Sequence, residues 1–282
     1  MSFTADDFID AHSHVWTPDV AAYPLAAGFE VADMSPASFT PDELLAECRP
    51  LGVRRVVLIQ MSYYKFDNRY LLDAIATSPD VFSGVATIDP GQPDLRDAMR
   101  RLALAGVRGF RLYAQRNNVE AWRDSPPMNA LWTHAADEGL AVCLLADPDA
   151  LPGIQALCDQ FPRTRVVIDH CARIGMRGAI DPADLDRLCR LADRPETYVK
   201  ISAFYALGAK RAPYADLGLM IRQLRDAYGA SRLMWASDAP FQTQGGHTYA
   251  DSLALVRDRL DFLTREEKSW LLRRTAQTVY FA

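Results

Sequence analysis

The sequence predicts an α/β fold, a TIM-like (β/α)8 barrel built as a single domain over residues 1–282. From residue 8 onward, short runs of apolar and β-branched residues alternate with amphipathic stretches, which is typical of βα units around a parallel sheet. A chain of 282 residues with 49 % hydrophobic residues can also fill one large core, and barrels of about 250 residues fold undivided. The runs that fit strands lie at residues 8–12, 53–60, 82–88, 107–112, 140–145, 165–169, 197–201 and 232–236.

Helix starts lie between these runs. Thr40-Pro41-Asp42-Glu43 and Thr264-Arg265-Glu266-Glu267 are capping boxes, in which each of the two outer side chains accepts a hydrogen bond from the other residue's backbone amide. Asp147-Pro148 and Asp181-Pro182 have the form of helix starts capped by aspartate. The last helix should cover residues 265–279, follow the eighth strand and close one end of the barrel. The long irregular stretch at residues 15–39 is expected to be a functional loop.

Charge and cysteine content limit the partners and the compartment. The formal net charge is −5 with acids and bases mixed along the chain, so no basic stripe is available for nucleic acid or anionic lipid. We therefore expect a small-molecule substrate, no nucleic-acid partner and no membrane partner. Five cysteines without a C-x-x-C pair predict a reducing, cytoplasmic location. The first ten residues do not resemble a signal peptide, and no run of about 18 apolar residues predicts a membrane span.

Two histidines stand at the end of the first predicted strand, in Asp10-Ala11-His12-Ser13-His14. Alternate side chains of an extended segment share a face, so His12 and His14 should point to one place. Such a pair can bind a divalent cation through ring nitrogens, or donate hydrogen bonds to a carbonyl oxygen when no metal is present. By itself this spacing is a weak signal, because it also arises by chance.

Two further polar residues end later strands. His170 follows the sixth strand and Asp238 follows the eighth, and barrel enzymes place their catalytic groups at these carboxyl ends. Taken singly, His170 could cap a turn and Asp238 could cap a helix. Taken with His12 and His14 they form a set of three nitrogens and one carboxylate, and three of the chain's five histidines then lie at strand ends. The set favours a catalytic or metal-binding site at the barrel mouth.

These motifs carry a family resemblance. Asp10-Ala11-His12-Ser13-His14, the strand end Ile168-Asp169-His170 and Trp235-Ala236-Ser237-Asp238-Ala239-Pro240 resemble the amidohydrolase superfamily, in its amidohydrolase-related branch. Within that branch the chain looks like the group of 2-pyrone-4,6-dicarboxylate hydrolase and sugar-lactone hydrolases. The resemblance implies a barrel fold and a hydrolase that opens a lactone or related cyclic ester of a small carboxylic acid.

The resemblance also limits the cofactor. Many amidohydrolases carry a lysine on the fourth strand and a histidine on the fifth to hold two metals, and neither residue is present in Gly109-Phe110-Arg111-Leu112 or Val142-Cys143-Leu144-Leu145. One divalent metal, with zinc as first candidate, or a site that works without metal is therefore expected. The metal ligands would be His12, His14, His170 and Asp238. Without metal, the resemblance implies that the histidines polarise the carbonyl and Asp238 takes a proton from water.

Residues near other strand ends are candidates for substrate contact. Arg111 and Arg173 can clamp a carboxylate, which suits an anionic cyclic ester, although either could instead form a salt bridge at the rim. Lys200 can bind an oxyanion or only extend along the barrel rim. Aromatic and amide side chains could stack on a ring, donate hydrogen bonds or simply pack the loops. These further candidates are Tyr63, Tyr64, Tyr205, Gln60 and Trp16.

Two other functions stay open beside the lactonase. A metal-dependent decarboxylase of an aromatic or muconate-type acid belongs to the same branch, but such enzymes usually add a second downstream histidine pair. A catalytically silent barrel that binds a ligand is the third reading, because this fold alone specifies no chemistry. His134 is expected to be an ordinary helix residue, and the glycine-rich loop around His247 either closes over substrate or only turns. The sequence leaves the oligomeric state open, with a homo-oligomer possible.

Overall fold

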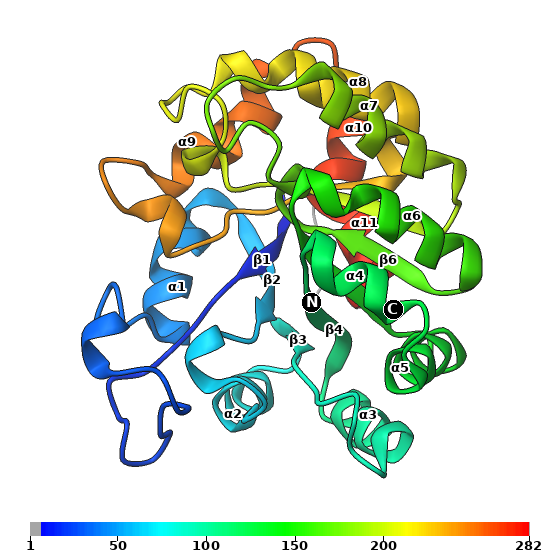
Figure 1. Cartoon of the computed structure of the whole chain (residues 1–282). Helices are drawn as coiled ribbons and strands as arrows, with labels where there is room; N and C mark the ends of the chain where they lie inside the picture. The colour runs from blue at the N-terminus through cyan, green and yellow to red at the C-terminus, as the bar shows by residue number, and fades with distance from the viewer. Residues whose placement is uncertain (1–6, 282) are drawn as a thin grey trace.

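Eight parallel strands form a barrel in which each strand pairs with the next along the chain (Figure 1). The structure is a computed structural model and describes residues 7–281. The backbone amide of His14 donates to the carbonyl of Ala239 at 2.8 Å, and the amide of Asp238 donates to the carbonyl of His12 at 2.8 Å, so the first strand also meets the last. The predicted (β/α)8 barrel is thus confirmed. Its strands are β1 (Phe8–Ser13), β2 (Val53–Ile59), β3 (Phe82–Ala86), β4 (Val107–Ala114), β5 (Ala141–Ala146), β6 (Arg165–Ile168), β7 (Thr197–Ile201) and β8 (Leu233–Trp235).

The helices lie outside the strands and the main core fills the layer between them (Figure 1). Thr40 and Thr264 form the predicted capping boxes, and Asp181 caps its helix through the amide of Ala183. The predicted helix cap at Asp147 is not formed. A 3-10 turn (Pro148–Ala150) follows this residue, and its carboxylate pairs with Arg173 instead of capping the turn. The helices are α1 (Pro41–Cys48), α2 (Arg69–Thr77), α3 (Leu95–Leu104), α4 (Arg116–Trp122), α5 (Pro126–Asp137), α6 (Leu151–Gln160), α7 (Pro182–Arg190), α8 (Gly218–Tyr228), α9 (Tyr249–Ala254), α10 (Arg265–Ser269) and α11 (Thr275–Tyr280).

The C-terminal helices cover the end of the barrel where the strands begin. A π-helical segment (Trp270–Arg274) joins α10 to α11. Near the start of β2, Arg55 donates a 2.9 Å hydrogen bond to Gln277 of α11. Tyr280 is fully buried and its hydroxyl lies 3.3 Å from the Sγ atom of Cys143 on β5. It belongs to a second, smaller core inside the barrel, formed by alternate strand residues. The opposite end, where the strands finish, is left for the site.

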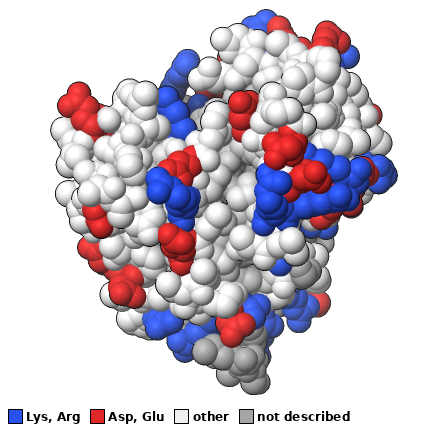
Figure 2. All heavy atoms as spheres, turned by 90° about the horizontal axis from the view of Figure 1, so that it is seen from below, with Lys and Arg blue, Asp and Glu red and all other residues white. Residues whose placement is uncertain are grey.

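Charges on the surface are interspersed. The face seen in Figure 2 shows basic side chains standing beside acidic ones, without a broad area of a single sign. Ion pairs also join opposite charges on the helices, as between Arg96 of α3 and Glu138 after α5 at 3.0 Å. Among the described residues, no helix has the length and apolar character needed to cross a membrane. Most of the segment on which the signal-peptide expectation was based, residues 1–6, lies outside the described residues.

Candidate active site

The end of β1 is fixed by a buried carboxylate. Asp10 is fully buried and accepts hydrogen bonds from the backbone amides of His12, at 3.0 Å, and Ser237, at 2.9 Å. The hydroxyls of Ser13 and Tyr249 also donate to it, at 2.8 and 2.6 Å. Asp10 therefore ties β1 to the turn after β8. The sequence contained this residue in its first motif, but nothing in the motif indicated that its role is to join two strands distant in sequence.

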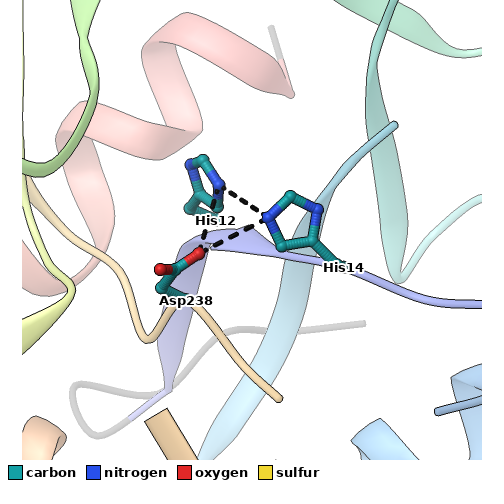
Figure 3. Close-up of side chains that lie close together, drawn as sticks. All are labelled: His12, His14 and Asp238. Carbon is teal, nitrogen blue, oxygen red and sulfur yellow. Dashed lines mark hydrogen bonds and ion pairs between the residues drawn. The ribbon is translucent and has the colours of Figure 1, made fainter. Parts of the chain in front are cut away.

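His12 and His14 point to one place, as strand alternation predicts (Figure 3). Their Nε2 atoms lie 3.2 Å apart. The Nδ1 atom of His14 lies 2.9 Å from the carbonyl oxygen of Ile59 at the end of β2. A carbonyl only accepts, so the Nδ1 atom of His14 carries a hydrogen, and Nε2 is the nitrogen directed to the site.

Asp238 reaches the same point from the turn after β8. Its backbone is in the left-handed region, with φ of 65°, and this turns the carboxylate back over the end of β1. The Oδ1 atom lies 3.5 Å from Nε2 of His12 and 3.4 Å from Nε2 of His14. The Oδ2 atom accepts a 2.8 Å hydrogen bond from the hydroxyl of Tyr205.

His170 completes the cluster from the end of β6. It is the first of four consecutive residues with positive φ, and the left-handed turn aims its ring inward. Its Nδ1 atom lies 2.8 Å from the hydroxyl of Ser202, and its Nε2 atom lies 3.8 Å from Oδ1 of Asp238. The structure thus brings all four predicted residues together at the barrel mouth.

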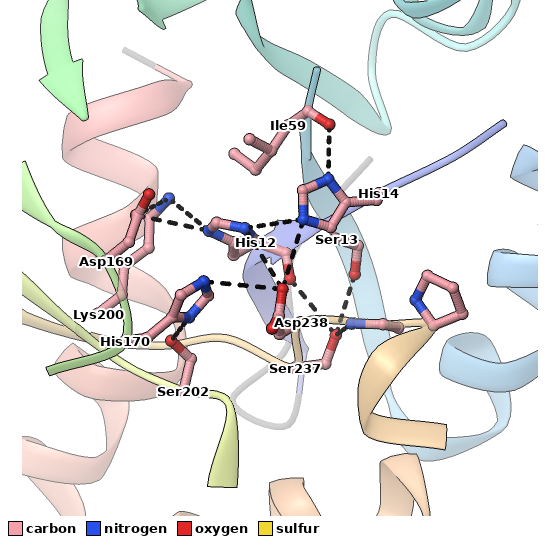
Figure 4. Close-up of polar contacts among 12 residues, drawn as sticks. His12, Ser13, His14, Ile59, Asp169, His170, Lys200, Ser202, Ser237 and Asp238 are labelled. Atoms are coloured by element: carbon pink, nitrogen blue, oxygen red, sulfur yellow. Dashed lines mark hydrogen bonds and ion pairs between the residues drawn. The ribbon is translucent and has the colours of Figure 1, made fainter. Parts of the chain in front are cut away.

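A second charged group, Lys200 with Asp169, lies beside this cluster, on the side of the His12 ring away from Asp238 (Figure 4). Lys200 on β7 and Asp169 after β6 are both fully buried and form an ion pair at 3.1 Å. Lys200 Nζ also lies 3.2 Å from Nδ1 of His12, on the side of the ring away from Asp238. Arg111 on β4 approaches Asp169 from the pocket side, with its Nε atom 3.9 Å from Oδ2. Lys200 therefore does not extend along the rim but contacts His12 on this side.

Burial and neighbouring charges set the ionisation of the site. Burial alone would raise the pKa of Asp238, but the charge of His170 and the hydrogen bond to His14 outweigh it and hold that pKa below the usual aspartate range. Burial, and for His12 also the charge of Lys200, lowers the pKa of both His12 and His170. Near neutral pH the site therefore holds an ionised Asp238 carboxylate beside the neutral rings of His12 and His170, the pairing that a general base requires.

Three of the four residues also fit a divalent metal. His12, His14 and Asp238 each offer one ligand atom within a common small sphere. Their ligand atoms are 3.2, 3.5 and 3.4 Å apart. Ligands at about 2.0–2.2 Å around a tetrahedral zinc are about 3.3–3.6 Å from one another, so the three atoms match one face of such a tetrahedron. His170 lies outside this group of three, with its Nε2 atom 3.8 Å from Oδ1 of Asp238.

A pocket of about 220 Å³ opens above these residues. His14, His170 and Asp238 form its floor, and Arg111 and Arg173 contribute its cationic groups. The remaining wall is mostly apolar and consists of Leu145, Met176, Ala203, Tyr205, Ala206, Leu207 and Phe241. The pocket therefore suits a small ring with a negative charge on one side.

Comparison with known proteins places this site in a family. The family model described as amidohydrolase matches residues 9–282. The chain belongs to the amidohydrolase family. An L-fucono-1,5-lactonase of Burkholderia ambifaria is 30 % identical over 243 residues, which cover 85 % of this chain and 82 % of that protein. A 2-pyrone-4,6-dicarboxylate hydrolase of Comamonas testosteroni is 26 % identical over 257 residues, covering 87 % and 80 %. The predicted resemblance to this group is confirmed.

A solved structure shows the same fold. An amidohydrolase of Burkholderia multivorans with bound Zn superposes with a TM-score of 0.81 at 23 % identity, covering 98 % of this chain and 99 % of that one. The likeness in fold therefore extends over nearly the whole length of both chains.

Four of the residues expected to contact the substrate do not line this pocket of the amidohydrolase. Trp16 is fully buried and its indole donates to the carbonyl of Pro36 at 2.8 Å. The hydroxyl of Tyr63 donates to the carbonyl of Asp33, and that of Tyr64 accepts from the amide of Thr17. Gln60 donates to the carbonyls of Lys65 and Asp67. Trp16, Tyr63, Tyr64 and Gln60 thus hold the loops after β1 and β2 in place, because their polar atoms are used within those loops.

The remaining histidines are outside the pocket. His134 is partly buried on α5. The Nδ1 atom of His247 lies 2.8 Å from the hydroxyl of Tyr214, which also accepts from Gln242 at 2.9 Å. This network anchors the glycine-rich loop after β8 next to Tyr205, whose amide lies 3.4 Å from Gln242 Oε1.

Proposed function

We propose that this amidohydrolase opens a lactone or related cyclic ester of a small carboxylic acid, with Asp238 as general base. The observation that carries the proposal is a buried, ionised carboxylate that faces three imidazole nitrogens on the floor of a pocket with a guanidinium in its wall. This arrangement provides a base, donors for a developing negative charge and an anchor for an anionic substrate.

Asp238 acts on the water that attacks the ester carbonyl. It takes one proton as the new carbon–oxygen bond forms, and the carbonyl oxygen becomes an oxyanion. When the intermediate collapses, the bond to the ring oxygen breaks and that oxygen receives the proton from Asp238. The hydroxyl of Tyr205 holds Oδ2 throughout, so that Oδ1 is the atom directed to the reacting centre.

The oxyanion needs donors fixed before the reaction begins. His170 lies on the pocket floor and His12 lies buried beside it and Asp238. Both can present N–H groups, since each ring has its other nitrogen, Nδ1, next to Ser202 or Lys200. If a divalent metal binds, His12, His14 and Asp238 would hold it and it would supply Lewis-acid stabilisation and an acidified water. Zinc is the candidate that the nitrogen and oxygen ligands favour.

The substrate charge would be met by Arg111. This guanidinium is only 6 % exposed, lines the pocket, and its Nε atom donates no hydrogen bond within the described residues. Arg173 is a weaker anchor, because it already pairs with Asp147 at 2.6 Å and is more exposed. One strongly held carboxylate next to an apolar wall therefore fits the pocket best.

The names of the relatives support the lactone, since one is a fuconolactonase and another a pyrone dicarboxylate hydrolase. For this chain the test is turnover of a panel of sugar lactones and carboxylated pyrones. Turnover is monitored by the release of protons, and the products are then identified. Asp238→Asn should reduce kcat by about 100-fold or more, the usual contribution of a general base. Asp193→Asn, an aspartate whose side chain is 81 % exposed, is the matched control and should leave turnover unchanged.

Other results would redirect the proposal. Carbon dioxide release in place of acid release would favour the decarboxylase, although His170 is the one histidine at the ends of β5 and β6. Ligand binding without turnover, unchanged in Asp238→Asn, would indicate a silent barrel. Elemental analysis together with activity before and after chelation would decide between metal ligands and bare donors. Size measurement in solution would show whether the proposed enzyme is a homo-oligomer.

A further inference from the structure

Gln242, in the loop after β8, is bonded to both residues of the Tyr205–Asp238 pair. Its backbone amide donates to the carbonyl of Asp238 at 3.2 Å, and its side-chain Oε1 atom accepts from the backbone amide of Tyr205 at 3.4 Å. Gln242 is fully buried and is not among the described residues that line the pocket. Any effect of this residue on catalysis must therefore pass through its neighbours.

The orientation of the Gln242 side-chain amide follows from its partners. The backbone amide of Tyr205 can only donate, so the side-chain oxygen must face it. The carbonyl of Thr248 can only accept and lies 3.2 Å from Nε2, so the nitrogen must point the other way. The second hydrogen of Nε2 is directed to the hydroxyl of Tyr214, at 2.9 Å. A rotated amide would place donor against donor and acceptor against acceptor, so this single orientation is fixed.

These contacts join two loops around Tyr205. Tyr205 and Tyr214 lie between β7 and α8. Gln242 and Thr248 lie between β8 and α9, in the loop that also carries His247. The ring of His247 stacks on that of Tyr214, with centroids 5.9 Å apart, and meets the ring of Tyr205 edge-on at 6.2 Å. Tyr205 is thus held at its backbone by Gln242 and at its ring by His247.

We propose that Gln242 is a positioning residue, which holds Tyr205 so that its hydroxyl stays bonded to Oδ2 of Asp238. The two oxygens are 2.8 Å apart, and a shift of about 1 Å would take them beyond hydrogen-bond distance. Because Gln242 is bonded to both residues, it fixes the spacing of the loops that carry them. Without its amide, Tyr205 is no longer tied to the loop of Asp238, and the carboxylate loses its fixed orientation. The kinetic consequence rests on the proposed function, whereas the hold on Tyr205 does not.

The kinetic test is a double-mutant cycle between Gln242→Met and Tyr205→Phe. Methionine keeps most of the side-chain volume and lacks the amide. Gln242→Met should lower kcat for a lactone by about 3- to 10-fold, the size of one lost neutral hydrogen bond, with a smaller change in KM. In the Tyr205→Phe protein the same change should lower kcat by less than about 2-fold, because the hydroxyl through which Gln242 acts is already absent. Equal losses in both backgrounds would mean that Gln242 only stabilises the fold, and would overturn the proposal.

A second variant keeps the test independent of whether Gln242→Met folds. Tyr214→Phe retains the ring and removes the hydroxyl that accepts from Nε2 of Gln242, so it should lower kcat by about 2-fold or more, and this loss should disappear in the Tyr205→Phe protein. Gln244→Met is the matched control. This glutamine lies in the same loop, but its amide donates to the carbonyl of Ser35 at 3.2 Å, so kcat should be unchanged.

Hydrogen exchange supplies a readout that needs no substrate. In Gln242→Met the backbone amide of Tyr205 should exchange about 3- to 10-fold faster than in the parent, because it has lost its acceptor, while the amides of β7 should exchange as before. Unchanged exchange at Tyr205 would overturn the proposal, whatever the enzyme hydrolyses. Faster exchange at Tyr205 in a protein whose parent hydrolyses no lactone would overturn the proposed function and still support the hold of Gln242 on Tyr205.

Discussion

The hydroxyl of Tyr205 donates a 2.8 Å hydrogen bond to Oδ2 of Asp238, and both groups line the same pocket. Burial and the charge of Asp238 raise the pKa of Tyr205, so the phenol keeps its hydrogen at any working pH. The pair fixes which carboxylate oxygen faces the substrate. Tyr205 should therefore act on the reaction by orienting the carboxylate of Asp238.

Tyr205→Phe should lower kcat by about 10-fold or more, because a hydrogen bond to a charged group contributes about 1.5–3 kcal/mol. KM should change less, since the ring that lines the pocket is retained. Steady-state kinetics on a lactone substrate measures both. Tyr23→Phe is the matched control, because it removes another tyrosine to aspartate bond of 2.8 Å at the surface. Equal kinetics in the two variants would show that Tyr205 does not position Asp238.

The acid limb of the pH profile of kcat/KM should lie at low pH. Asp238 is active when ionised, and its pKa is below the ordinary aspartate value of 3.8. His12 and His170 have pKa values below 6.5, so they remain neutral as the pH falls through that value. Activity should therefore stay level as the pH falls through 6.5 and decline only further into acid, where these imidazoles and then Asp238 gain protons. A limb near pH 6.5 in the pH–rate profile would contradict this assignment.

Arg111→Met should raise KM for a carboxylated lactone. Loss of a charge-assisted pair in a buried position costs about 1.5–3 kcal/mol, which is about 10- to 150-fold in kcat/KM. A neutral lactone of the same ring should lose much less, and this difference between substrates is the decisive readout. Arg116→Met, at a residue with a side chain 70 % exposed, serves as control. A uniform loss on both substrates would mean that Arg111 mainly supports Asp169.

Asp10→Asn should destabilise the fold. The carboxylate accepts hydrogen bonds from two backbone amides and from neighbouring hydroxyls between β1 and the turn after β8, and an amide cannot accept them all. The free energy of unfolding should fall by about 3 kcal/mol, measured by urea denaturation. Ser13→Ala removes one of the donors and should cost about 1 kcal/mol. Similar losses in the two variants would argue against Asp10 as the junction of the two strands.

Local sequence patterns predicted the strands, the helix starts and the direction of the side chains at the end of β1, because these features depend on residues close together in the sequence. The strands follow apolar runs, and the helices capped by Thr40 and Thr264 begin where the capping boxes stand. Strand alternation alone aims His12 and His14 at one point, because successive side chains must lie on opposite faces. The position of His170 and Asp238 after their strands then places them at the same end of the barrel.

Tertiary structure decided how side chains at similar strand positions are used. Trp16 and Tyr63 follow β1 and β2, and Arg111 lies within β4. All three are buried, but loop folding packs Trp16 and Tyr63 within the loops while Arg111 lines the pocket. The placement of Lys200 and Asp169 beside His12 depends on how β6 and β7 align with β1 across the barrel interior. The sequence therefore determined which chemical groups reach the barrel mouth. Their roles were decided by contacts between distant strands and loops, because hydrogen-bond partners and burial depend on three-dimensional packing.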